Sequence, residues 1–302
     1  MTVSSSPEWA ALQDNADVQG RIGALWIYPV KSCAGVPVVS ARLTATGLEH
    51  DREWMVVDPQ GVFLTQRSHA RMALIQPQLR GAGADAVLVL QAPGMPECVV
   101  TPDAQPASMQ VQVWEDTVSA HDQGDAVAQW LQDFLQTPCR LVRFDAAHTR
   151  ACSRKWTGDD AAQTQFADGY PLLLTTEAAG EELAERVQAA GGPAVDLRRI
   201  RPNVVLQGLQ PHEEDYLATV HIAAEGGVVA LRPVKPCTRC PIPDIDPDTA
   251  LSSHHVSNAL ATYRADDRMD GAITFGMNAI AVQGEGLVLA VGQAVAGELA
   301  FD

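Results

Sequence analysis

The chain has 302 residues, 46% of them hydrophobic and 19% charged, and its 21 lysines and arginines against 37 aspartates and glutamates give a formal net charge of −16 at pH 7. This charge argues against a nucleic-acid partner, because binding to a phosphate backbone depends on clustered lysine and arginine, and it disfavours an anionic membrane surface for the same reason. The length allows a well-buried core and two domains.

Residues 1–20 are polar and have no basic start, apolar stretch or cleavage-like site, so we expect a partly disordered lead-in rather than a signal peptide. No apolar run elsewhere approaches the roughly 18 residues of a membrane helix. We therefore expect a cytoplasmic protein with no membrane partner. Six cysteines are too few for a secreted disulfide scaffold of this length, which predicts free thiols.

The first half of the chain is predicted to be mostly β. We expect strands at 21–30 and 36–43 around a Lys-Ser-Cys-Ala-Gly turn, a hairpin at 53–65, and further strands at 86–92, 108–122 and 139–145. One amphipathic helix is predicted at 124–136, because apolar residues there take helical spacing, at Val127, Trp130, Leu131, Phe134 and Leu135.

The second half begins with a polar, aperiodic stretch at 148–169, a loop or domain boundary. Thr176 is placed to cap a second helix that Gly191 and Gly192 end, and from residue 201 the pattern is β again. The predicted fold is α+β and predominantly β, with two β-rich, barrel-like lobes and few helices. We divide it into a lead-in at 1–20, a first domain at 21–145, a connecting loop at 146–169 and a second domain at 170–302.

Basic residues are few and stand beside cysteines. Of the three lysines, Lys31 and Lys235 occur in nearly identical motifs, PVKSC at 29–33 and PVKPC at 233–237. Taken singly, each basic residue is explained by a solvated surface or an ion pair. Their grouping at predicted strand ends favours an anion pocket, because planar guanidinium groups bind phosphate in bidentate geometry.

The pair Cys237 and Cys240 allows several interpretations. A zinc half-site needs another ligand pair, and His254 and His255 are adjacent rather than spaced for zinc. A thioredoxin-like dithiol needs a helix directly after it, which the prolines at 241, 243 and 247 oppose. Two structural cysteines, or one activated thiolate that binds a soft metal or carries sulfur, are the other readings. Nearby Lys235 and Arg239 favour an ionised thiol.

Several sequence motifs together resemble those of the MOSC proteins. The resemblance is to members with an N-terminal MOSC-associated β-barrel-like domain, the family of the mitochondrial amidoxime-reducing component and its bacterial relatives. The motifs are YPVKSC, HDREWMVVD, RPNVVLQG, PCTRCPIPDIDPDT, FGMNAI and VGQAV. They occur in the order of the family and span residues 21 to 300, nearly the whole chain.

The resemblance implies a molybdenum cofactor (Mo-molybdopterin) held between two β-rich domains, with Cys240 as the catalytic cysteine and metal ligand. It further implies that the pterin and its phosphate are bound by residues at matching motif positions. These are Lys31, Ser32, Arg52, Arg201, Asn203, Thr238 and Arg239, together with Arg67 and Thr176, which follow the corresponding strand and open the corresponding helix.

The reaction that the resemblance implies is the two-electron reduction of small N-hydroxylated molecules, such as hydroxylamines, amidoximes and N-hydroxylated bases, to amines. The chain has no C-x4-C-x2-C cluster motif and no strand-GxGxxG-helix nucleotide motif, so we expect a separate electron donor, either a reductase or an iron-sulfur protein. The alternative is a sulfur-transfer protein that carries a persulfide on Cys240, because MOSC domains also occur attached to cofactor sulfurases. A further alternative is a cofactor-binding protein without activity.

Overall fold

The computed structural model describes residues 6–81, 83, 86–101 and 107–300. Its largest element is a closed barrel of seven strands, in which β12 pairs with β17 to complete the ring β12-β13-β1-β19-β14-β15-β17. These barrel strands are β1 (Val18–Ile27), β12 (Leu172–Thr176), β13 (Val204–Gln207), β14 (Leu217–Ala224), β15 (Gly227–Thr238), β17 (Ala272–Gln283) and β19 (Ala294–Leu299). The fold is thus predominantly β with few helices, as predicted from the sequence.

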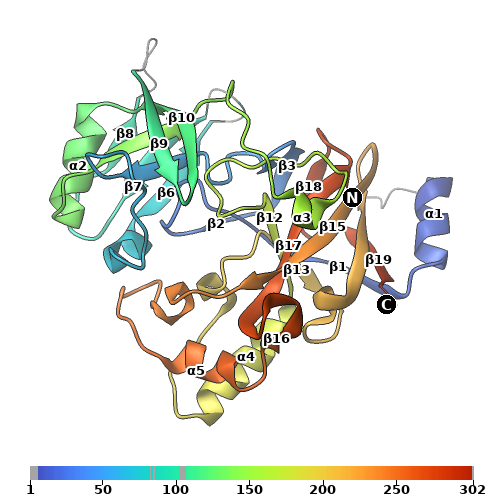
Figure 1. Ribbon diagram of the computed structural model, residues 1–302. Coiled ribbons are helices and arrows are strands. Elements are labelled where there is room, and N and C mark those ends of the chain that lie inside the picture. The colour runs from blue at the N-terminus through green and yellow to red at the C-terminus, as the bar shows by residue number, and fades with distance from the viewer. Residues whose placement is uncertain (1–5, 82, 84–85, 102–106, 301–302) are drawn as a thin grey trace.

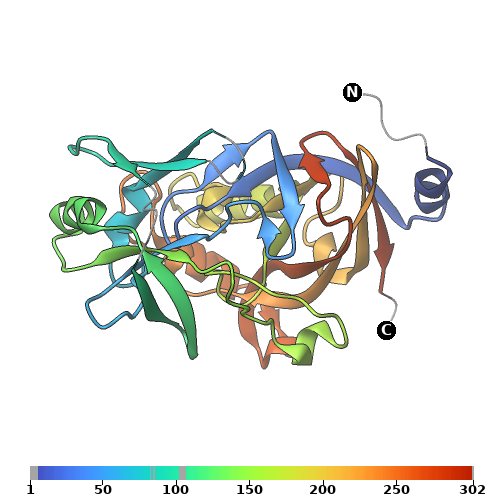
Figure 2. The ribbon, with the colours of Figure 1, turned by 90° about the horizontal axis from the view of Figure 1, so that it is seen from above.

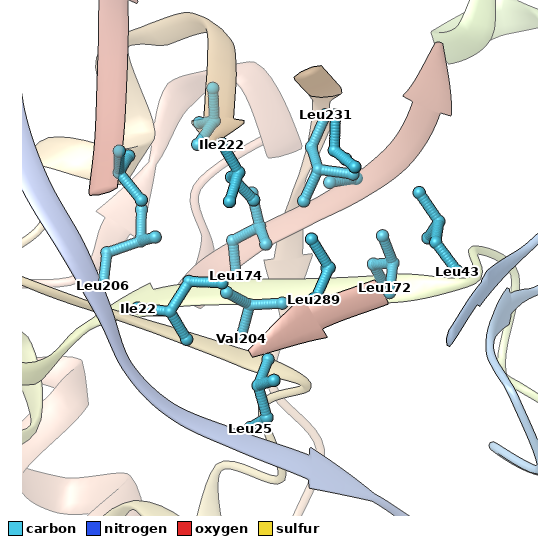
Figure 3. Packing of buried hydrophobic residues seen from close by; sticks show 14 of the residues in the cluster. Ile22, Leu25, Leu43, Leu172, Leu174, Val204, Leu206, Ile222, Leu231 and Leu289 are labelled. Atoms are coloured by element: carbon cyan, nitrogen blue, oxygen red, sulfur yellow. The ribbon is translucent and has the colours of Figure 1, made fainter. Parts of the chain in front are cut away.

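The interior of the barrel is filled by aliphatic side chains from every wall. Ile22, Leu174, Val204, Ile222 and Leu231 are each fully buried and point toward one another (Figure 3). Burial of a leucine or isoleucine of this kind contributes about 1.5–3 kcal/mol relative to exposure. The barrel is therefore a packed core and not a channel, and a ligand site has to lie outside it.

A second body, which we call the small lobe, lies beside the barrel (Figure 1, Figure 2) and holds a four-stranded sheet in the order β5-β11-β10-β9 and a three-stranded sheet in the order β6-β7-β8. Its elements are β5 (Trp54–Val57), η1 (Ala70–Leu74), β6 (Gln76–Arg80), β7 (Val87–Gln91), β8 (Cys98–Val100), β9 (Ser108–Val113), β10 (Asp116–Asp122), α2 (Asp125–Leu135) and β11 (Arg140–Phe144). The apolar face of α2 is buried against this lobe at the positions that the helical spacing predicted. The stretch 108–122, expected as a strand, is a hairpin of β9 and β10.

The remaining elements decorate the barrel. They are α1 (Pro7–Asp14), β2 (Val36–Val38), β3 (Ser40–Thr44), β4 (Gly47–Leu48), α3 (Arg154–Thr157), α4 (Glu177–Ala189), η3 (Leu197–Arg199), η4 (Glu213–Tyr216), η5 (Ile242–Asp244), α5 (His255–Ala261), β16 (Ala265–Asp266), η6 (Asp267–Met269) and β18 (Val288–Ala290). Helices α4 and α5 pack together over Phe275 of β17. Within the described ranges, no helix combines the length and the apolar character that a membrane crossing requires.

The expected lead-in differs from the structure over most of its length. Residues 1–5 lie outside the described residues, but α1 begins directly after Ser6, whose side chain accepts a hydrogen bond from the Trp9 amide. The Trp9 side chain is buried against Ala223, Val228 and Ala296 of the barrel. Disorder was expected because the sequence of this short helix is polar, and the contacts that hold it, chiefly that of Trp9 with the barrel, arise only on folding.

The strand pairing also crosses the expected domain division. Strand β1, assigned to the first domain, pairs with β13 and β19 in the barrel, and β3 pairs with β18 near the C-terminus. The chain thus starts in the barrel, leaves it to form the small lobe and returns at β12. Local sequence predicts that a segment is a strand, whereas its partner is selected by long-range packing, so the pattern alone did not reveal this exchange.

Candidate functional site

Two adjoining cavities lie where the small lobe meets the barrel. The inner cavity has a volume of about 120 Å³ and the outer cavity about 300 Å³, and they share a wall formed by residues 237–240 at the end of β15. Nine of the ten residues expected from the sequence line the inner cavity: Lys31, Ser32, Arg52, Arg67, Arg201, Asn203, Thr238, Arg239 and Cys240. Lys235 lines the outer cavity. The two Pro-Val-Lys motifs, at 29–31 and 233–235, therefore meet at these adjoining cavities.

Lys31 is held almost out of solvent at the turn that follows β1. Its side chain is 5% exposed, and its ammonium donates a hydrogen bond to the Phe166 carbonyl at 2.8 Å and forms an ion pair with Asp168. Burial lowers the pKa of Lys31, and the charge of Asp168 opposes this effect. Asp168 was not found from the sequence, because one carboxylate in a polar, aperiodic loop gives no local signal among 37 acidic residues.

Arg52 and Arg201 both stack on the ring of Tyr28, with each guanidinium carbon 4.2 Å from the ring centre. Arg52 also pairs with Asp51 at 2.5 Å, and Arg201 donates to the Cys33 carbonyl at 2.6 Å. Burial lowers the pKa of Arg201 to about 10, so the side chain stays cationic at neutral pH. Two guanidinium groups fixed on one aromatic ring form a positively charged wall that is prepared for an anion.

The backbone is strained at this wall. Ser32, Arg52 and Arg201 have φ angles of 64°, 51° and 64°, in the left-handed region that residues other than glycine seldom adopt. Such conformations cost about 1–3 kcal/mol each and persist where the surrounding structure imposes them, often at ligand sites. Three strained residues in one cavity wall therefore mark this wall as a binding surface independently of its charge.

Asn203 organises the cavity from beneath. It is 1% exposed, its Oδ1 accepts hydrogen bonds from Arg52 and from the Leu173 amide, and its Nδ2 donates to the Trp26 carbonyl. Because its side chain is engaged in these three bonds, Asn203 orients Arg52 and joins β1, β12 and the segment before β13.

The end of β15 and the loop that follows it present two half-buried, free cysteines, Cys237 in the strand and Cys240 in the loop. Arg239 lies between them in sequence and donates to Cys237 Sγ at 3.1 Å and to the Ile200 carbonyl at 2.9 Å. Its Nε is buried without a hydrogen-bond partner among the described residues. An orphaned guanidinium nitrogen at the cavity wall is costly unless a ligand accepts from it, which fits an anionic group bound there.

Thr176, the tenth residue expected from the sequence, caps the start of α4. It does not line either cavity; its hydroxyl oxygen accepts hydrogen bonds from the amides of Ala179 and His212, both at 3.2 Å. The cap predicted for α4 is therefore present, and it uses the hydroxyl that was expected at the cofactor. The assignment of Thr176 to the cofactor followed only from its position next to a motif, and it stays a prediction.

The carboxylates that follow Cys240 serve the loop itself. Asp246 accepts from the amides of residues 248 and 249 and pairs with Arg199, and Asp248 pairs with Arg198. These two carboxylates are thus engaged in a turn and in ion pairs of the loop. In the described part of the chain, no group of three or more histidine, cysteine or acidic side chains is arranged to hold a metal ion, so the zinc interpretation gains no additional ligands.

The cavity suits a cofactor that brings its own metal ligands. Five cations line the inner cavity, namely Lys31, Arg52, Arg67, Arg201 and Arg239, against one carboxylate, that of Asp168. This excess of positive charge lies in a chain of net charge −16. The free thiol of Cys240, the orphaned guanidinium nitrogen of Arg239 and the cationic wall fit molybdopterin, whose phosphate and dithiolene are anionic and leave one metal site for a protein thiolate.

Comparison with known proteins gives the class of this fold and site. Residues 19–138 match the MOSC N-terminal beta barrel domain and residues 161–296 match the MOSC domain. The chain belongs to the MOSC proteins that carry this N-terminal domain, which confirms the resemblance seen in the motifs.

Its relatives include the human mitochondrial amidoxime reducing component 2, which is 32% identical over 277 residues, a match that covers 88% of this chain and 79% of that protein. The mouse mitochondrial amidoxime-reducing component 1 is 33% identical over 264 residues, covering 84% and 74% of the two chains. The human molybdenum cofactor sulfurase is 28% identical over 270 residues, covering 84% of this chain but only 29% of that protein.

Proposed function

We propose that this protein is a molybdenum-cofactor-dependent oxidoreductase that reduces N-hydroxylated compounds, and that a separate reductase or iron-sulfur protein supplies its electrons. The observation that carries the proposal is the placement of Cys240 in the wall of a cavity that five cations line. The names of the relatives support the same reaction, since they are amidoxime reducing components.

The residues divide the work of holding the cofactor. Cys240 is the protein ligand to the metal, and the cationic groups of Lys31, Arg52 and Arg201 neutralise the phosphate and pterin side. Arg239 Nε, which lacks a partner among the described residues, donates to the bound anion. When bound, the cofactor would supply a two-electron redox centre for the cleavage of an N–O bond. In the balanced reaction the N–O bond breaks, two electrons and two protons are consumed, and an amine or amidine and water leave.

Cys237 has a different role from Cys240. Its sulfur accepts a hydrogen bond from Arg239 and packs with the cluster around α4, α5 and Phe275. Cys237 therefore helps to fix the guanidinium of Arg239. The hydrogen bond from Arg239 to the Ile200 carbonyl holds the same guanidinium from a second direction.

Metal analysis of protein from a host that makes the cofactor tests this proposal. We expect about one molybdenum per chain and reduction of benzamidoxime with reduced methyl viologen as the donor, and Cys240→Ser should lose both. The matched control is Cys98→Ser, a free, half-buried cysteine of β8 in the small lobe, which should keep both. Full molybdenum occupancy without reduction of any N-hydroxylated substrate would argue for a cofactor-binding protein without activity.

Sulfur transfer is the second candidate function, favoured by the similarity to molybdenum cofactor sulfurase. In that case the protein would be purified without molybdenum and would carry sulfur that cyanide releases as thiocyanate. This sulfur would vanish in Cys240→Ser and persist in Cys98→Ser. The two functions thus give opposite results for metal content and for cyanide-releasable sulfur.

A further inference from the structure

Cations without a partner are concentrated at the two cavities. Twelve of the 21 lysines and arginines have an acidic side chain within 4.0 Å among the described residues. Of the nine others, Arg67, Arg201, Lys235 and Arg239 line the inner or the outer cavity. A chain with so many carboxylates leaves these cations without an acidic neighbour in its described part, which indicates that they serve a ligand rather than the fold.

The outer cavity has aromatic walls at fixed positions. Trp114, which is 41% exposed, stands at the turn between β9 and β10 with a φ of 56°. Its Nε1 donates to Asp168 at 3.1 Å, its ring centre lies 5.2 Å from that of Phe63, and the guanidinium of Arg67 stands 4.4 Å above it. A large exposed ring held by this many contacts is a surface on which a planar molecule can stack.

Lys235 adds a further cation to the lining of the same cavity. Its ammonium stands 5.9 Å from the ring centre of Tyr170 and 5.8 Å from that of Trp156, and Lys155 lies 5.3 Å from the same Trp156 ring. The main chain of Lys235 is fixed by a hydrogen bond from Asn278 to its carbonyl at 3.2 Å. Lys235 therefore has a defined place in the wall of the outer cavity, which Tyr170 and Cys240 also line.

We propose that the outer cavity selects planar N-hydroxylated substrates that carry a negative charge, a carboxylate or phosphate, and that Arg67 and Lys235 bind this charge while Trp114 stacks on the ring. The proposal rests on the proposed function and names the charge class of its substrates. The one acidic group of this cavity, Asp168, is engaged by Lys31 and Trp114. A cationic substrate would face Arg67, Lys235 and Arg239 without compensation, and like charges at short range oppose binding.

Three benzamidoximes that differ only in the para group test the inference: the carboxylate, the neutral carboxamide of nearly the same shape, and the cationic aminomethyl compound. With the cofactor-loaded protein and reduced methyl viologen at about 20 mM salt, we expect kcat/KM for the carboxylate to exceed that for the carboxamide by about tenfold or more. The cationic compound should be the poorest. Raising the salt to about 200 mM should reduce the preference.

The preference should fall to about threefold or less in Lys235→Gln, while kcat/KM for the carboxamide stays within about threefold of the wild type. The matched control is Arg42→Gln, an exposed arginine of β3 with no carboxylate within 4.0 Å in the described ranges, which lines neither cavity and should keep the full preference. A wild-type preference below about threefold, or one that Lys235→Gln does not reduce, would overturn the inference.

Binding of compounds that cannot be reduced separates this inference from the proposed function. By calorimetry, 4-carboxybenzamide should bind the wild-type protein about tenfold more tightly than terephthalamide, and Lys235→Gln should abolish the difference. If that holds while no benzamidoxime is reduced, the proposed reaction fails and the anion cavity stands. If all three benzamidoximes are reduced with equal kcat/KM, the reaction stands and the charge selection fails.

Discussion

Arg52 and Asn203 are 151 residues apart in the chain and meet at the inner cavity, where Arg52 Nη1 donates a hydrogen bond to Asn203 Oδ1 over 3.0 Å. Arg52 comes from the turn before β5 of the small lobe and Asn203 from the segment before β13 of the barrel. One buried amide therefore positions a cation of the cavity and at the same time ties the two bodies together. Binding capacity and folding stability should be coupled at this residue.

Replacement of Asn203 with alanine should therefore lower both the folding stability and the capacity to bind the cofactor. The change leaves the Leu173 amide and the Arg52 guanidinium without their acceptor in a site that is 1% exposed. We expect the free energy of unfolding to fall by about 2–4 kcal/mol, measured by urea denaturation, and the molybdenum content to fall with it. Asn258→Ala, at an exposed position of α5, is the control and should change the free energy of unfolding by less than about 0.5 kcal/mol.

The elements that could be predicted from sequence are those with local signals. The helical spacing of Val127, Trp130 and Phe134 predicted α2, and the position of Thr176 predicted the start of α4. The pairing of β1 with β13 and β19 could not be predicted, because any apolar strand of suitable length satisfies the local pattern. Closure of the barrel depends on which strands β1 pairs with, and the local pattern does not specify them.

The residues of the site, too, fall into those that the sequence could predict and those that it could not. The basic residues of the site could be predicted because lysine is rare in this chain and occurs in two nearly identical motifs that end in cysteine. Tyr28, Trp114 and Asp168 were missed, because their roles arise only after folding: as a ring under two guanidinium groups, at a hairpin turn, and as the partner of Lys31. Groups that compensate or orient a charge carry no composition signal of their own.

Gly276 of the FGMNAI motif is required by the closure of the barrel. Its φ is 72°, and a Cβ atom built there would lie 2.6 Å from the Leu174 carbonyl oxygen of β12, the strand that pairs with β17. Gly276→Ala should therefore lower the free energy of unfolding by about 3 kcal/mol or more, because both the left-handed backbone and the contact with β12 are unfavourable.

Gly271 provides the matched control for this change. Its φ is 78°, but a Cβ atom there would meet nothing within 4 Å. Gly271→Ala should cost only the backbone term, about 1 kcal/mol, so the difference between the two variants in urea denaturation isolates the contact with β12. Equal losses in the two variants would show that closure of the barrel at β12 does not depend on the missing side chain of Gly276.

Glu214, which is buried next to the barrel, should make the free energy of unfolding depend on pH. Its carboxyl group is fully buried in η4, where Thr175 donates to Oε1 at 3.1 Å, and burial with the neighbouring charge of Asp215 raises its pKa to about 7. Between pH 4.5 and 7 the folded protein keeps a proton that the unfolded chain releases, so this group makes the free energy of unfolding fall as pH rises. His212 acts in the opposite direction, because burial lowers its pKa to about 4, and its contribution rises with pH between 4 and 6.5.

The variant Glu214→Gln removes the first of these opposing contributions and keeps an oxygen that can accept from Thr175. Relative to the wild type, its free energy of unfolding should increase by about 2–3 kcal/mol between pH 5 and pH 8, as measured by urea denaturation at several pH values. Glu181→Gln, at an exposed position of α4, should leave the pH dependence of the wild type in place. A stability difference between Glu214→Gln and the wild type that stays constant across this range would mean that Glu214 is already ionised in the folded protein at pH 5.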